Sequence, residues 1–244
     1  MPNVNGEWIM LGTTSNSSIC LKSVEQLEAL VDSIGFLPLF ANGVKGFSVE
    51  ERTIAKSWWS GDAAKDPWEW RAIVAERGNV AYGKFFDKKA GFISKKWLPM
   101  FANARRDGYD FDARWDDEKA QLRQKKIMDL FVNGERRMSY DVKQLAGFCK
   151  DGEKNFDGVL TELQMETYLC VSAFKRRKNK AGEEYGWAVA EYATPETLWG
   201  YDLVASGYKD DPKHSAELIR QRLCEMFPDA TPREMNKILS LPCD

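Results

Sequence analysis

Histidine is almost absent from this chain, and its cysteines show no metal-binding spacing. His214 is the one histidine among 244 residues. The five cysteines contain no CxxC pair and have no histidine close by: Cys20, Cys149, Cys170, Cys224 and Cys243. Zinc sites need three or four such ligands at short spacings, so we expect no metal site. His214 also has no Cys or Ser partner nearby, which argues against a nucleophilic triad.

The sequence also lacks the common nucleotide-binding and hydrolase motifs. GxGxxG, GxxxxGK[ST], GxSxG and HExxH are all missing, and each of them carries phosphate, nucleophile or metal chemistry at a fixed spacing. We therefore expect no cofactor. Any active site would be poor in motifs, and the residues alone assign no catalytic group.

No apolar run has the length of a membrane span, and no secretion or lipidation signal is present. Scattered cysteines are typical of reduced thiols, so we expect a cytoplasmic protein without a membrane partner. Hydrophobic residues make up 43% and charged residues 30% of the chain, and the net charge is -2. A weakly acidic protein does not attract polyanions over its whole surface, so any nucleic-acid site must be a local basic patch.

Turn signals and composition divide the chain into four stretches. Residues 1–22, rich in Asn, Ser, Thr and Gly, form a leader, and residues 23–115 form a Trp-rich α+β region. Residues 116–200 are winged-helix-like, and residues 201–244 supply C-terminal helices that pack on the core. The expected fold class is α+β and predominantly helical.

A nearly continuous run of cations marks the expected hairpin that follows Phe174. These cations are Lys175, Arg176, Arg177, Lys178 and Lys180, and a Gly-containing turn comes next. Like charges at this density repel each other unless an anion lies nearby, and phosphate is the commonest anion of that kind. The alternative is a solvated edge strand whose cations only block unwanted strand pairing.

Three helical patterns precede this hairpin, over residues 123–132, 139–148 and 160–171. Thr161 and Gln164 have capping-box spacing at the start of the third pattern. Three helices followed by a basic hairpin are typical of a winged-helix domain that binds DNA. In a helix-turn-helix arrangement the last helix enters the major groove, so Thr161, Gln164 and Thr167 are predicted to face the duplex.

Residues 58–71 contain the densest aromatic cluster in the chain. The candidate pocket residues are Trp58, Trp59, Asp62, Asp66, Trp68, Trp70 and Arg71. Indole rings can form a stacking site for a base or another small flat ligand. They also dominate ordinary cores through their area, which is the alternative here. Arg105 and Arg106 end a predicted helix, where they either complement the helix dipole or bind phosphate.

Seven short strings recur together in one known family. They are GFLPLF, WWSGD, DPWEWR, YGKFFDKKAGFIS, RRDGYDFDARWDD, LQMETYL and GWAVAEY. In these strings, which span most of the chain after about Leu21, the sequence resembles small bacterial proteins called AlkZ-related. The resemblance implies kinship to winged-helix DNA glycosylases that excise alkylated bases or unhook interstrand crosslinks without a metal or nucleotide cofactor. Their Gln-hydrophobic-Gln or Gln-hydrophobic-Asp motif has no match here. The nearest string is Gln164-Met165-Glu166, to which we transfer no role.

Three functions follow as hypotheses. The leading one is a DNA-binding winged-helix protein in DNA repair, with DNA as the partner. The first alternative is a metal-independent DNA glycosylase that excises alkylated bases. The second is a ligand-sensing or protein-interaction module without a nucleic-acid role.

Overall fold

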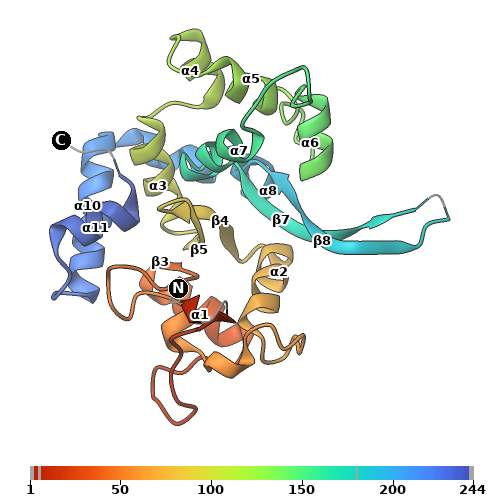
Figure 1. Cartoon of the computed structure of the whole chain (residues 1–244). Coiled ribbons are helices and arrows are strands. Elements are labelled where there is room, and N and C mark those ends of the chain that lie inside the picture. The colour runs from red at the N-terminus through yellow and green to blue at the C-terminus, as the bar shows by residue number, and fades with distance from the viewer. Residues whose placement is uncertain (1–2, 5–6, 180, 242–244) are drawn as a thin grey trace.

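The computed structural model describes residues 3–4, 7–179 and 181–241, and the fold is α+β, as the sequence predicts (Figure 1). The N-terminal half contains an antiparallel sheet in the order β3-β5-β4, with helices around it. Its elements are β1 (Asn3–Val4), β2 (Glu7–Trp8), α1 (Val24–Ile34), β3 (Phe36–Pro38), η1 (Glu50–Arg52), η2 (Ala55–Ser57), α2 (Pro67–Arg77), β4 (Val80–Phe86), β5 (Lys89–Ser94) and α3 (Leu98–Arg106).

The second half holds another antiparallel sheet, in the order β6-β8-β7, and most of the remaining helices. Strands β7 and β8 extend as a long arm on the side opposite α10 and α11 (Figure 1). Its elements are α4 (Phe111–Asp116), α5 (Leu122–Met128), β6 (Arg137–Met138), α6 (Ser139–Leu145), α7 (Phe156–Met165), β7 (Cys170–Lys178), β8 (Glu184–Ala193), α8 (Pro195–Trp199), α9 (Tyr201–Val204), η3 (Ala205–Lys209), α10 (Pro212–Met226) and α11 (Pro232–Leu239). Among the helices of the described residues, none is both long and apolar enough to cross a membrane.

Local capping explains where α2 begins and ends. The Asp66 carboxylate accepts the backbone N–H of Trp68, Pro67 occupies the first turn, and Gly78 ends the helix in a left-handed conformation. Proline needs no N–H partner at that position, and glycine carries no Cβ to oppose a positive φ. Helix α2 packs against β4 and β7, where it forms one wall of a cavity.

The helix expected over residues 160–171 is wrong in both of its bounds. Helix α7 begins at Phe156 and ends at Met165. Thr167 then has φ 63°, a left-handed value that stops the helix, and β7 starts at Cys170. The capping box at Thr161 is wrong as well, because the Thr161 hydroxyl donates to the Asp157 carbonyl oxygen (2.6 Å) from the middle of the helix. The predicted helix runs too far because Leu169 and Val171, which are buried beyond the turn, continue the apolar pattern of the helix.

Arg105 and Arg106, predicted as phosphate contacts, lie in the interior and not on the surface that such contact requires. Arg105 donates to three carbonyl oxygens, those of Phe85 (2.7 Å), Met165 (3.0 Å) and Leu239 (2.7 Å). These carbonyls belong to β4, α7 and α11. Arg105 therefore joins three elements that are remote in the sequence.

Arg106 makes a second set of buried contacts beside it. Its guanidinium forms an ion pair with Glu196 (2.5 Å) and donates to the Thr167 carbonyl oxygen (2.6 Å) and the Tyr208 hydroxyl (2.9 Å). Only 1% of Arg106 is exposed. An arginine this deeply buried needs such partners, because a buried charge is costly when it is unpaired.

We predict that Arg105→Met lowers the free energy of unfolding by about 3 kcal/mol or more, since buried carbonyls without donors cost about 1–3 kcal/mol each. Urea denaturation measures the change. Arg176→Met, which removes the same charge from an exposed residue, should change stability by less than about 0.5 kcal/mol. Equal effects of the two substitutions would contradict the bridging role of Arg105.

Candidate pocket and basic hairpin

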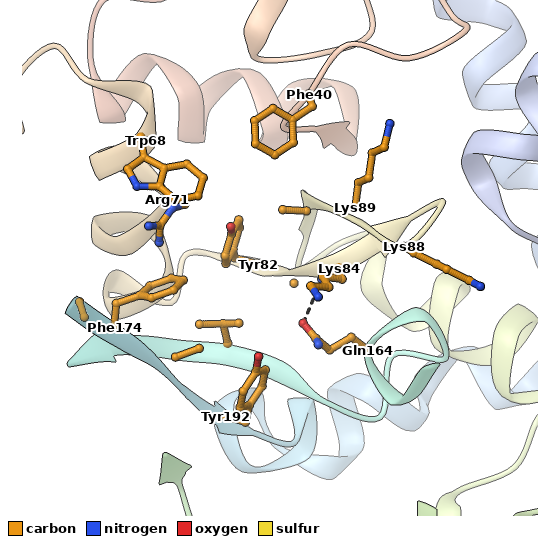
Figure 2. A pocket seen from close by; sticks show the side chains of 15 residues that line it. Phe40, Trp68, Arg71, Tyr82, Lys84, Lys88, Lys89, Gln164, Phe174 and Tyr192 are labelled. Carbon is orange, nitrogen blue, oxygen red and sulfur yellow. Dashed lines mark hydrogen bonds between the residues drawn. The ribbon is translucent and has the colours of Figure 1, made fainter. Parts of the chain in front are cut away.

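A cavity of about 480 Å³ lies between α2, the β4–β5 hairpin, the end of α7 and the base of the β7–β8 arm (Figure 2). This size falls within the usual range for small-ligand sites, about 300–1,000 Å³. Most of its wall is aromatic or apolar, and the remainder carries amide, hydroxyl and cationic groups. The lining residues are Phe40, Trp68, Arg71, Tyr82, Gly83, Lys84, Lys88, Lys89, Ala90, Gln164, Val171, Phe174, Ala188, Ala190 and Tyr192.

Arg71 is the central charged group of the pocket wall. Its guanidinium lies 3.7 Å from the ring centroid of Trp68 and 4.1 Å from that of Phe174 (Figure 2). The Nε and one terminal nitrogen are buried and have no hydrogen-bond partner among the described residues. Burial lowers the pKa of Arg71. The positive charge of Arg71 in an apolar wall favours a ligand that presents oxygen atoms or negative charge.

Two tyrosines add hydroxyl groups to the same wall. Burial raises the pKa of Tyr82 to about 12, and the nearby Arg71 charge opposes this rise. Burial also raises the pKa of Tyr192 above its ordinary value. Both phenols are therefore neutral near pH 7, when each can donate or accept a hydrogen bond.

The pocket is cationic at its rim. Lys84, Lys88 and Lys89 line it together with Arg71, and the described lining includes no Asp, Glu or His. With several cations and no anion in its wall, the cavity should attract anionic ligands over cationic ones. In the part of the chain that the structure describes, no group of three His, Cys, Asp or Glu residues lies close enough to hold a metal ion.

The third predicted helix turns its polar face inward. The Gln164 side-chain oxygen accepts the Lys84 backbone N–H (3.1 Å), and its nitrogen donates to the Leu160 carbonyl oxygen (3.0 Å). Thr161 accepts a hydrogen bond from the Lys84 ammonium group (3.2 Å), and Thr167 is wholly buried. The three residues predicted to face a duplex thus bind α7 and its following turn to the protein itself.

The outward face of α7 is acidic. Asp157 and Glu162 are its exposed charged residues. Carboxylates repel phosphate, so this face is poorly suited to lie in a major groove.

The predicted Trp-rich pocket is divided between the cavity and the core. Trp68 and Arg71 line the cavity. Trp59 is 47% exposed, and its ring centroid lies 6.5 Å from that of Trp68. Trp58 and Trp70 are buried, and the Trp58 indole N–H donates to the Thr53 hydroxyl (2.9 Å). Of these indoles, Trp68 therefore lines the cavity, whereas Trp58 and Trp70 belong to the core.

The two aspartates of the cluster do not line the cavity. Asp66 is fully buried and accepts the backbone N–H groups of Trp59, Gly61 and Trp68 at 2.9–3.1 Å. Asp62 is exposed and pairs with Lys65 (3.4 Å). Asp66 shapes the loop that presents Trp59 and Trp68, whereas Asp62 belongs to the surface.

Four aromatic members of the cavity were missed by the sequence prediction. Phe40, Tyr82, Phe174 and Tyr192 come from four separate segments. From the sequence alone, each resembles an ordinary core residue of a strand or loop. No signal within the chain marks them as neighbours, because their proximity depends on how β4 packs against the β7–β8 arm.

The cations of the β7–β8 arm fall into two groups. Lys175 forms an ion pair with Glu191 (2.6 Å), and the Arg177 guanidinium lies 4.6 Å from the Tyr140 ring centroid. Arg176 and Lys178 are exposed, and neither forms an ion pair or ring contact among the described residues; Glu184 lies directly opposite Lys178 in the strand register. Lys180 lies outside the described residues. Arg176 and Lys178 are therefore the cations of the arm best placed to bind an external anion.

The arm and the pocket are physically continuous. Phe174, Ala188 and Ala190 belong to β7 and β8 and also line the cavity. Arg176 comes two positions after Phe174 on the same strand. A ligand held by the arm can therefore reach the mouth of the pocket.

Comparison with known proteins yields one family match. A family model described as AlkZ related matches residues 21–240, nearly the whole chain. No curated protein and no solved structure matches the chain.

The raised pKa of Tyr82 predicts a loss of stability in alkali. The pKa in the folded state, about 12, exceeds the ordinary value of 10.0, so the neutral phenol stabilises the fold fully below pH 10. This contribution is lost as the pH rises from about 10 to about 12, by on the order of 2 kcal/mol. Urea unfolding at pH 9 and pH 11.5 should show a smaller loss in Tyr82→Phe than in the unmodified protein. Tyr201→Phe, at an exposed tyrosine, should leave the loss unchanged; a Tyr82→Phe variant as alkali-sensitive as the parent would disprove the assignment.

Proposed function

The chain belongs to the AlkZ-related family, and on this premise we propose that it binds DNA through a winged-helix domain and acts in DNA repair. The domain comprises α5, β6, α6, α7, β7 and β8, in that chain order. A winged helix has this order: three helices, with a short strand between the first two, followed by a β-hairpin. The sheet order β6-β8-β7 supports the assignment, since the hairpin closes onto the strand that precedes α6.

The observation that carries the proposal is the pair of exposed cations on the projecting arm. Arg176 and Lys178 are exposed on a β-ribbon that extends away from the rest of the protein (Figure 1). Phosphate contacts of this type supply affinity without sequence information. The phosphate contacts lie on the arm and not on α7, because the exposed face of α7 carries Asp157 and Glu162.

We predict that Arg176→Ala combined with Lys178→Ala weakens duplex affinity to a similar degree for unrelated sequences. Two lost phosphate contacts should flatten the slope of log K against log salt concentration by roughly 2. Fluorescence anisotropy with a labelled duplex at several salt concentrations measures both quantities. Lys209→Ala with Lys213→Ala is the matched control, because it removes the same charge from exposed lysines beside and within α10.

The control variant should bind as tightly as the unmodified protein. Equal weakening by the two double variants would show only a general charge effect and would contradict an arm-specific contact. An unmodified protein without salt-dependent binding would defeat the proposal itself.

A second candidate function is base excision, with the pocket receiving a base turned out of the duplex. The cavity is large enough for a small ligand, is lined by aromatic rings, and lies at the base of the proposed DNA-binding arm. Enzymes that act on bases hold the extruded base by stacking and by hydrogen bonds to its edge. Here Trp68 and Phe174 offer stacking surfaces, while Tyr82 and Tyr192 offer hydroxyl groups. No carboxylate stands among the described lining residues to act as general base, so the hydrolytic step has no assigned residue.

A pocket-filling substitution tests this candidate without deleting an existing contact. Ala188→Phe places a ring at the exposed edge of the cavity. On a duplex that contains N7-methylguanine, we expect the unmodified protein to release the free base. The variant should release it at least tenfold more slowly while duplex affinity changes less than about twofold. Chromatography of the released base gives the rate; no release from either alkylated or crosslinked duplex by the unmodified protein would eliminate base excision.

A further inference from the structure

Trp187 on the arm has almost no contact with its own chain. Its exposed fraction is 91%, the highest among the large hydrophobic residues that the structure describes. Tryptophan offers on the order of 200 Å² for burial, and most proteins use that surface in a core or an interface. The residue therefore has no packing role in the isolated fold.

The backbone around Trp187 departs from regular strand pairing. The register of β7 and β8 passes from Lys175 opposite Val189 to Arg177 opposite Tyr185. Gly186, Trp187 and Ala188 consequently face the single residue Arg176. Such a bulge re-aims side chains and commonly lies beside functional sites.

Glycine makes this bulge feasible. Gly186 has φ 71°, in the left-handed region that favours glycine. A Cβ at Gly186 would meet no atom within 4 Å, so the surroundings do not require glycine at this position. The left-handed backbone conformation favours glycine, and it displaces Trp187 from the paired residues of β7 and β8.

The charges near Trp187 indicate the kind of partner that would cover it. Arg176 lies opposite the bulge, Lys178 follows on the same strand, and Tyr185 is 50% exposed on the neighbouring strand. Two exposed cations, placed beside exposed aromatic rings, form the combination that binds single-stranded nucleic acid. In such sites the cations hold phosphates while the rings stack on bases. An apolar protein partner would instead desolvate both cations and would supply no counter-charge to Arg176, whereas Lys178 has Glu184 opposite it.

We propose that Trp187 stacks on an unstacked base of the DNA that Arg176 and Lys178 hold by its phosphates. This inference rests on the proposed DNA-binding function and narrows its substrate class. The preferred substrate is DNA with an unpaired base, such as a gap, a mismatch or a single-stranded segment, over an intact duplex. The adjacent Ala188 lines the pocket, so the stacked base and the pocket mouth are neighbours.

The test uses the full chain and two probes of identical sequence. One probe is an intact duplex, and the other carries one unpaired 2-aminopurine beside a gap. We expect the unmodified protein to bind the gapped probe about tenfold more tightly and to quench its 2-aminopurine fluorescence. Trp187→Ala should lose about tenfold in affinity for the gapped probe, in line with the measured range for base stacking, and less than twofold for the intact duplex. Trp187→Phe, which keeps an aromatic face, should retain part of the preference and of the quenching.

Tyr201→Ala removes another exposed ring, one that lies outside the arm, and should change neither affinity. Because Trp187 is exposed, the thermal transition of its variants should equal that of the unmodified protein. Unchanged binding by Trp187→Ala, or equal loss on both probes, overturns the inference while salt-dependent binding through Arg176 and Lys178 leaves the proposed function standing. An unmodified protein that binds neither probe overturns both.

Discussion

The buried pair Arg105 and Arg106 at the end of α3 connects elements that are remote from one another in the sequence. Arg105 joins carbonyl oxygens of β4, α7 and α11, and Arg106 joins Thr167 to Glu196. Each guanidinium presents several donors in a fixed plane, so it can satisfy carbonyl groups from different directions at once. These bonds thereby join β4 to α7, and both of these elements contribute lining residues to the cavity.

The cavity combines an apolar wall with a small number of charged groups, as ligand sites commonly do. Its wall is mainly aromatic, yet it contains the Arg71 guanidinium with unused donors and a rim of lysines. The rings of Trp68 and Phe174 stabilise the cation through their π faces without consuming its hydrogen-bond donors. Arg71 is therefore held in position between two rings, and its charge suits a flat ligand with an acidic or carbonyl edge.

Charge distinguishes the exposed face of α7 from the β7–β8 arm. Docking of α7 onto β4 uses the polar side chains Thr161 and Gln164, and the face left outside carries carboxylates. The arm, by contrast, exposes Arg176, Lys178 and Trp187, with Glu184 opposite Lys178 in the strand register. In a weakly acidic protein, such a local group of exposed cations is better suited to an anionic partner than the acidic face of α7 is. Membership of the AlkZ-related family agrees with such a role.

Local signals in the sequence determined much of the secondary structure. Ser23 and Asp66 cap the starts of α1 and α2, Gly35 and Gly78 follow their ends, and the β7–β8 hairpin forms where the sequence predicts one. These features depend on neighbours within a few positions, which the sequence displays directly. The cation run and the exceptional Trp density were visible for the same reason. Whether Arg105 and Arg106 are buried and whether Gln164 faces outward were decided by contacts between residues 61 to 134 positions apart. Only the tertiary structure could decide them, because a polar side chain carries the same local pattern whether its partner is a distant carbonyl group or a phosphate.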